Sequence, residues 1–257
     1  MDYFVNINNP RCADIFSKHS AWSSYICSTF VLCFALLFLI SCNSPPTGQS
    51  GSHALQLQQA PGARLTYVAI GASDTFGLGA DDPQTQSWPD DLAMKLGSGV
   101  RLVNLGIPGI TLHQALNVEV RVAIDARPNL VTIWLAVNDL ANGVPIANYT
   151  HDLDLLVSRV QRANTHTHIV IANVPDLTFL PYFSGLDPQN LYTEIQDYNN
   201  AIAGVAQRHH ITLVDLYAQW RELRTHPEDI SADGLHPSTL GYTRISELFY
   251  HALQVTP

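Results

Sequence analysis

The sequence predicts an α/β domain of three layers, in which a doubly wound, mainly five-stranded parallel sheet lies between two layers of helices. Two observations lead to this fold class. From Leu65 onward, short apolar runs alternate with longer amphipathic stretches, and such alternation of strands and helices is typical of parallel sheets. The expected strands are also apolar almost throughout, as strands covered by helices on both faces are.

Each expected strand is a short apolar run, and each expected helix is a longer stretch with apolar residues at helical spacing. The strands are predicted at 65–70, 101–107, 130–137, 168–174 and 211–217. The helices are predicted at 87–97, 111–128, 148–164, 191–210 and 239–254. Pro89 lies in the first turn of the first helix, where proline is tolerated. Pro128 ends the second helix, because proline cannot continue one.

Composition fits one globular domain with an additional segment. The chain has 257 residues, of which 46% are hydrophobic, so it can bury a sizeable core. The formal net charge is -9, and Lys and Arg form no cluster. These features argue against a nucleic-acid partner, because binding to phosphates requires clustered positive charge.

Cysteine usage divides the chain. All four cysteines, Cys12, Cys27, Cys33 and Cys42, lie in the first 42 residues. The main domain therefore has neither a disulfide nor a thiolate that could act as nucleophile or metal ligand. The pair His166 and His168 could suggest a metal, but no carboxylate or cysteine completes a ligand set nearby. We expect no metal site.

The N-terminal region is predicted to target the protein to a membrane. Residues 26–40 are apolar and uncharged, and basic residues precede them, as in a secretory signal. Leu39 to Cys42 resembles a bacterial lipobox, which implies cleavage before Cys42 and attachment of lipid to it. The alternative is an uncleaved anchor helix that starts near Ala21. Both interpretations place the main domain outside the cytoplasm, attached to the membrane.

The predicted organisation has three parts. Residues 1–42 form the signal or anchor, residues 43–63 form a flexible tether rich in Pro, Gly and Ser, and residues 64–257 form the main domain.

Polar residues follow four of the predicted strands, where open α/β sheets bind ligands. Gly71–Asp74 follow the first strand, Asn104–Gly106 the second and Asn138–Asp139 the third. Asp233–His236 come after the fifth strand, past a short helix. Together these segments supply a hydroxyl, a glycine amide, a carboxamide, a carboxylate and an imidazole, which are the groups that acyl transfer requires.

The four blocks GASD, NLG, AVND and DGLH, in this order, resemble those of the SGNH (GDSL-type) hydrolases. The resemblance covers nearly all of 65–254 and implies the flavodoxin-like fold of that family. It implies Ser73 as nucleophile, with His236 as base and Asp233 as the third member of a triad. It implies an oxyanion hole made by the amides of Ser73 and Gly106 and the side chain of Asn138. It implies neither a metal ion nor an organic cofactor.

Two positions depart from the family pattern. Ala72 replaces the aspartate of the first block, and Ala136 replaces the glycine of the third. Ala72 removes a supporting hydrogen-bond acceptor, for which Asp74 is the nearest substitute. Asn104 and Asp139 are interpreted as structural residues that bind nearby backbone.

The predicted function is hydrolysis of carboxylic esters through an acyl-enzyme on Ser73. Candidate substrates are lipid, lysophospholipid, aryl or acylated-sugar esters. The loop at 175–192 is apolar and aromatic and is expected to overhang the site, which favours an acyl chain or an aryl group. An acyltransferase and a binding protein without catalysis are the alternatives. The sequence leaves the oligomeric state open.

Overall fold

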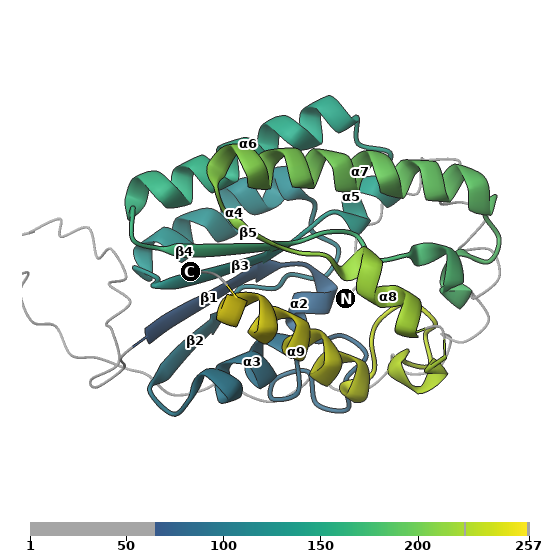
Figure 1. The fold of residues 1–257 in the computed structure, drawn as a ribbon, viewed down its shortest axis with the longest axis horizontal. Coiled ribbons are helices and arrows are strands. Elements are labelled where there is room, and N and C mark those ends of the chain that lie inside the picture. Colours follow the sequence, from purple (N-terminus) through teal and green to yellow (C-terminus); the bar gives the residue numbers. More distant parts are fainter. Residues whose placement is uncertain (1–64, 224, 256–257) are drawn as a thin grey trace, which may run out of the picture.

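The computed structural model describes residues 65–223 and 225–255. Five parallel strands form one sheet in the order β2-β1-β3-β4-β5 (Figure 1). The strands are β1 (Leu65–Gly71), β2 (Val100–Asn104), β3 (Leu130–Trp134), β4 (His168–Ala172) and β5 (Thr212–Val214). The predicted parallel sheet is therefore confirmed. The strand order reverses between β1 and β3, where such sheets bind their ligands.

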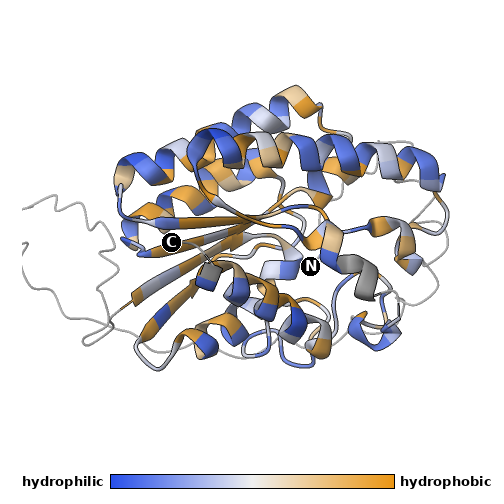
Figure 2. Cartoon of the chain, viewed as in Figure 1, coloured by the Kyte–Doolittle hydropathy of each residue, from blue (hydrophilic) through white to orange (hydrophobic). Residues whose placement is uncertain are grey.

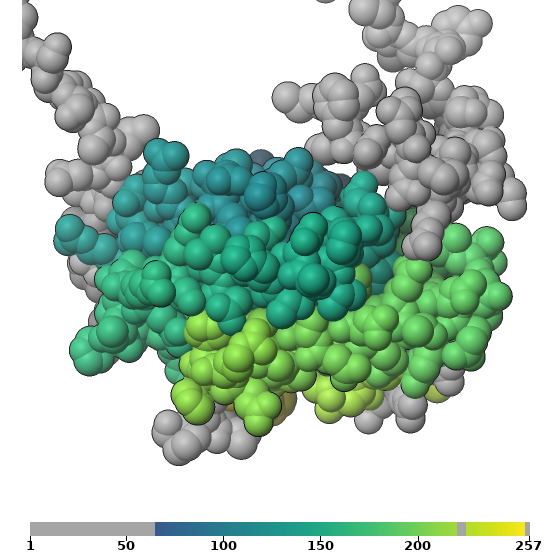
Figure 3. All heavy atoms as spheres, turned by 90° about the horizontal axis from the view of Figure 1, so that it is seen from above, coloured from purple at the N-terminus to yellow at the C-terminus, as the bar shows by residue number. Residues whose placement is uncertain are grey.

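Helices cover both faces of the sheet. One layer contains α4 (Leu112–Asp125), α6 (Ile146–Ala163) and α7 (Pro188–His209). The other contains α3 (Trp88–Leu96) and α9 (Thr239–Val255). Figure 1 shows the sheet between these layers, and Figure 3 shows α4, α6 and α7 beside one another when the molecule is seen from above.

The helices turn their apolar faces to the sheet and their polar faces outward (Figure 2). Between α3 and α9, Trp88 stacks on Phe249 with ring centroids 4.2 Å apart. Between α6 and α7, Tyr149 packs against Tyr198 at 4.7 Å. Full burial of a large apolar side chain contributes about 1.5–3 kcal/mol, so these contacts help fix the layers on the sheet.

Four predicted strands are too long at their C-terminal ends. The strand predicted at 168–174 ends at Ala172. The prediction of 130–137 is wrong beyond Trp134, because the chain turns into the short helix α5 (Val137–Ala141). The strand predicted at 101–107 ends at Asn104. The strand predicted at 211–217 covers only Thr212–Val214, and α8 (Leu216–Leu223) follows it. In each case, apolar residues beyond the strand still pack on the core, so hydrophobicity alone does not mark where the strand stops.

The loop between β4 and α7 contains the 3-10 turns η1 (Leu177–Phe179) and η2 (Pro181–Phe183). Helix α7 starts at Pro188, three residues before the predicted start, because Asp187 caps it by accepting from the amides of Gln189 and Asn190. A further turn, η3 (Pro227–Asp229), precedes α9.

The predicted signal or anchor and the tether lie outside the described residues. Among the helices of residues 65–223 and 225–255, none combines the length and apolar character needed to cross a membrane.

Candidate active site

Ser73 lies immediately beyond the carboxyl end of β1, as the first residue of the short helix α2 (Ser73–Phe76). Gly71 makes the tight exit from the strand possible. A Cβ at this position would overlap the side chain of Thr75 and lie 3.0 Å from the carbonyl oxygen of Trp134. The turn therefore requires glycine and aims the Ser73 hydroxyl at the edge of the sheet.

The structure brings the predicted triad together. The His236 Nε2 atom lies 2.9 Å from Ser73 Oγ, and the His236 Nδ1 atom lies 2.6 Å from Asp233 Oδ2. Ser73 and His236 are 9% and 8% exposed. With Nδ1–H donating to the carboxylate, the tautomer that fits leaves Nε2 to accept the serine proton, which is the arrangement that activates a hydroxyl.

The Asp233 carboxylate accepts four hydrogen bonds, one of them from the His236 ring. Burial opposes its ionisation, but the bond from the His236 ring, the amides of Leu235 and His236, and the Ser231 hydroxyl together lower the pKa of Asp233. Oδ1 accepts the two amides and the hydroxyl at 2.8–2.9 Å. Oδ2 accepts the imidazole. The carboxylate therefore stays ionised while it orients the base.

Backbone contacts hold the triad loop in place. The Ser231 amide donates to the His236 carbonyl at 2.8 Å, and Ile230 pairs with Pro237 in an antiparallel bridge. The Tyr182 amide donates to the Gly234 carbonyl at 3.1 Å, which ties this loop to the η2 turn. The position of His236 is thus set by the loop itself and by a neighbouring element.

Asn138 lies on the same cavity as Ser73 and His236. Its Nδ2 atom donates to the Ile110 carbonyl at 2.9 Å. A carboxamide NH₂ carries two hydrogens, so one remains available to a group bound in the cavity. This is the geometry that a side-chain oxyanion donor needs.

A second cavity lies beside the first, and the two share Asp74, Trp134, Val137 and Leu235 as lining residues. The loop that was expected to overhang the site contributes Pro175, Leu177 and Leu180 to the second cavity. An ester bound at Ser73 therefore has an adjoining, largely apolar space for one of its two parts.

Gly106, the predicted glycine donor, is engaged within the protein. Its amide donates to Asn104 Oδ1 at 3.0 Å, while Asn104 Nδ2 donates to the Thr75 carbonyl at 2.7 Å. Gly106 also lies against the backbone of Thr75 and Phe76, which a Cβ would overlap. Its role as donor remains a prediction and requires the bond to Asn104 to be exchanged for one to the substrate. The interpretation of Asn104 as structural agrees with these bonds and with a third, from Asn104 Nδ2 to the Ser87 hydroxyl.

Sequence reasoning missed Glu119. This side chain of α4 is 1% exposed, and its Oε2 atom accepts from the Gly71 amide at 3.0 Å. Burial raises the pKa of Glu119 to about 8, and the bond from Gly71 lowers it only in part. Glu119 thus supplies a carboxyl group at the strand end that carries the nucleophile, and Asp74 does not contact that amide. The only signal in the sequence was an acidic residue between two valines, Val118 and Val120, on α4.

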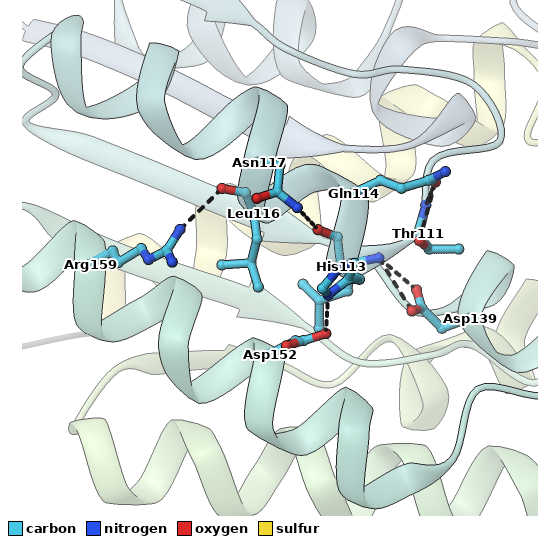
Figure 4. Close-up of polar contacts among 9 residues, drawn as sticks. Thr111, His113, Gln114, Leu116, Asn117, Asp139, Asp152 and Arg159 are labelled. Carbon is cyan, nitrogen blue, oxygen red and sulfur yellow. Dashed lines mark hydrogen bonds and ion pairs between the residues drawn. The ribbon is translucent and has the colours of Figure 1, made fainter.

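Asp139 binds the start of α4, as its interpretation as a structural residue requires. Its two carboxylate oxygens accept from the Leu112 amide at 3.2 and 3.0 Å (Figure 4). Burial raises the pKa of Asp139 to about 7, against the bond from Leu112 that lowers it. Asn138 adjoins Asp139, and Ile110 lies two residues before Leu112. The bond between Asp139 and the Leu112 amide therefore helps fix the distance between Asn138 and the Ile110 carbonyl that it binds.

The described residues contain no group of three or more His, Cys, Asp and Glu side chains arranged to hold a metal ion. His168 instead lies 3.3 Å from the Thr212 hydroxyl, at the start of β4.

Comparison with known proteins adds the family. The model of the GDSL-like lipase/acylhydrolase family matches residues 69–244, more than half of the chain. No curated protein matches the chain.

Solved structures share the fold at low sequence identity. TesA is 22% identical, with a TM-score of 0.62 over 74% of this chain and 98% of its own. A lipase/acylhydrolase from Enterococcus faecalis is 22% identical, with a TM-score of 0.59 over 75% and 98%. The psychrotrophic esterase EstA from Pseudoalteromonas sp., in a structure inhibited by monoethylphosphonate, is 18% identical, with a TM-score of 0.60 over 74% and 97%.

Proposed function

The chain belongs to the GDSL-like lipase/acylhydrolase family, and from this premise we propose that it cleaves carboxylic esters through an acyl-enzyme on Ser73. The observation that carries the proposal is the continuous chain of contacts from Asp233 through His236 to Ser73, at 2.6 and 2.9 Å. No other hydroxyl in the described residues has an imidazole nitrogen and a carboxylate aligned behind it in this way.

In the first half of the reaction, Ser73 Oγ attacks the ester carbonyl carbon while His236 Nε2 takes the hydroxyl proton. The carbonyl π electrons move onto the oxygen and form a tetrahedral intermediate. When they return, the bond to the alcohol oxygen breaks, and His236 delivers the proton to the departing alcohol. Asp233 stabilises the imidazolium throughout.

In the second half, water replaces the alcohol. His236 takes one proton from water as its oxygen attacks the acyl carbon on Ser73. Collapse of the second tetrahedral intermediate releases the carboxylic acid and returns the proton to Ser73 Oγ. If an alcohol takes the place of water, the same steps transfer the acyl group, so the ratio of acid to new ester measures the balance between the two outcomes.

The negative oxygen needs donors on the side opposite His236. The Ser73 amide and the free hydrogen of Asn138 Nδ2 are two such donors. The Gly106 amide is the third in our proposal, once it leaves Asn104. If the Gly106 amide stays bound to Asn104, the amide of Gly109 is the third donor in its place, because it donates to no group in the described part of the chain. Each such donor contributes about 3–4 kcal/mol to transition-state stabilisation.

The two adjoining cavities indicate the substrate class. Their walls are mostly apolar, which suits the acyl chain or aryl group of lipid, lysophospholipid, aryl or acylated-sugar esters.

A fluorophosphonate probe and an ester panel test the proposal. The similar Pseudoalteromonas esterase was inhibited by a phosphonate. We expect stoichiometric labelling of Ser73, and loss of both labelling and ester hydrolysis in Ser73→Ala. His236→Ala should lose about as much activity as Ser73→Ala, and the double variant little more, because the residues act as a unit. A Ser73→Ala protein that keeps more than about a tenth of the parent activity would contradict the mechanism.

We also propose that the protein is held outside the cytoplasm on the membrane by lipid on Cys42, because Leu39 to Cys42 resembles a lipobox. Cys42→Ala should lose incorporation of labelled fatty acid and leave the protein misplaced, whereas Cys33→Ala should change neither. A parent protein that retains residues 1–41 and carries no lipid would refute this, and would favour the uncleaved anchor.

A further inference from the structure

Asp74 occupies an unusual place beside the nucleophile. It lines both the cavity over Ser73 and His236 and the second cavity next to it. Every other residue that lines the second cavity is apolar, among them Trp134 and the loop residue Leu177. A single carboxyl group therefore faces an otherwise apolar space directly beside the reacting centre.

Within residues 65–223 and 225–255, neither Lys nor Arg acts as a counter-ion for the carboxyl of Asp74. Its hydrogen bond is to its own backbone amide, and neither Lys nor Arg lines either of the two cavities. The ionisable groups that act on the pKa of Asp74 are His236 and Asp233, which already pair with each other. Burial raises the pKa of Asp74, and the opposing effect of His236 is smaller. Ionisation of a half-buried carboxyl without a partner is unfavourable, and a ligand that brings a positive charge would favour the ionised form.

We infer that Asp74 makes the site selective for esters that carry a positive group, such as a quaternary ammonium, in the part seated in the second cavity. The inference rests on the proposed ester hydrolysis and specifies its substrate class. The apolar wall suits the methyl groups of such an ion, since a quaternary ammonium has no hydrogen to donate and needs only contact and a negative charge.

Matched esters that differ only in charge test this selectivity. One pair is choline butyrate and its carbon isostere, in which a tert-butyl group replaces the trimethylammonium. A second pair carries the same two groups at the end of the acyl chain of a p-nitrophenyl ester, so that either part of the substrate can reach the second cavity. In at least one pair, we expect kcat/KM to be about tenfold higher for the cationic ester, and the preference to shrink as salt increases.

The variant Asp74→Asn removes the charge and keeps the size of the side chain. It should bring the cationic-to-neutral ratio close to one in the pair that shows the preference. Asp125→Asn, the same change at an exposed position on the last residue of α4, should leave both the ratio and the rates as in the parent. Equal rates within both pairs for the parent, or an unchanged ratio in a folded Asp74→Asn, would overturn the inference.

A measurement on the parent alone covers the case in which Asp74→Asn does not fold. Tetramethylammonium chloride should inhibit hydrolysis of the neutral esters more strongly than sodium chloride at the same concentration, and equal inhibition would count against the role of Asp74. Failure of the proposed function looks different, because then none of these esters, neutral or charged, is hydrolysed.

Discussion

Glu119→Gln tests whether a buried, protonated carboxyl group holds the strand that carries Ser73. The substitution keeps the size of the side chain and an oxygen that can accept from the Gly71 amide, but it removes the ability to ionise. Glu119 Oε1 has no hydrogen-bond partner within the described residues, so the new NH₂ group occupies the place of an already unpaired atom. Below about pH 5, where Glu119 is protonated, we therefore expect parent and variant to have similar stability.

The magnitude follows from the pKa. Burial raises the pKa of Glu119 from 4.5 to about 8. The difference of about 3.5 corresponds to roughly 5 kcal/mol, since one pKa unit equals about 1.4 kcal/mol. Between these two pH values the folded protein holds a proton that the unfolded chain has released. The contribution of Glu119 to stability is therefore fully present below about pH 4.5 and is lost as pH rises to about 8.

Urea unfolding followed by tryptophan fluorescence measures the effect, because Trp88 and Trp134 are buried in the core. The free energy of unfolding should be determined for both proteins at intervals from about pH 5 to about pH 9. Asp139 and other carboxyls with raised pKa values also lower the stability of both proteins over this range. No charged neighbour contributes to the pKa of Glu119, so the difference between the two curves isolates this residue.

We expect the stability of Glu119→Gln relative to the parent to increase by several kcal/mol, up to about 5, from the acidic to the alkaline end. Glu247→Gln, at an exposed position on α9, should give a curve parallel to that of the parent. Parallel curves for Glu119→Gln would refute the reasoning, because they would show that Glu119 ionises as easily in the folded protein as in the unfolded chain.

Three further substitutions probe the surroundings of Ser73. Asn138→Ala should lower kcat about 10²–10³-fold in an ester assay while the protein stays folded, as loss of one oxyanion donor does; a smaller loss than tenfold would argue against that role. Gly106→Ala should lower the free energy of unfolding by about 1–3 kcal/mol and slow labelling of Ser73, because its Cβ would overlap the backbone of Thr75 and Phe76. Tyr242→Phe removes the 2.6 Å bond to the Leu78 carbonyl and should lower the free energy of unfolding by about 1–3 kcal/mol, with an unchanged urea midpoint as the contradicting result.

The sequence was sufficient to predict the sheet and the proximity of Ser73, Asp233 and His236, because both depend on local patterns. An almost continuous apolar run marks each inner strand of a parallel sheet, and at Leu65–Gly71 the run also ends in a glycine turn. The carboxyl ends of parallel strands meet at one edge, so residues that follow different strands converge there without any knowledge of the loops. The pair Asp233 and His236 is held by a four-residue loop, whose span alone keeps the two side chains close.

The strand ends and the supporting residues could not be predicted, because they depend on contacts between distant segments. Apolar residues such as Leu135 and Val137 continue past the end of β3, since the core extends beyond the sheet. Glu119 is 48 residues from Gly71, and a single glutamate on an amphipathic helix gives no sign of which amide it will meet. The bond between Gly106 and Asn104 is local, but it opposes the role that the family pattern suggests for Gly106.

The turn that carries Ser73 is held at three successive points by three different parts of the fold. Glu119, on one helical layer, binds the Gly71 amide at 3.0 Å, and Asn104, the last residue of β2, binds the Thr75 carbonyl at 2.7 Å. Tyr242, on the opposite layer, binds the Leu78 carbonyl. A turn held from both faces of the sheet cannot shift toward either layer without breaking one of these bonds. This explains how the position of Ser73 stays fixed although Ala72 offers no side-chain oxygen to hold it.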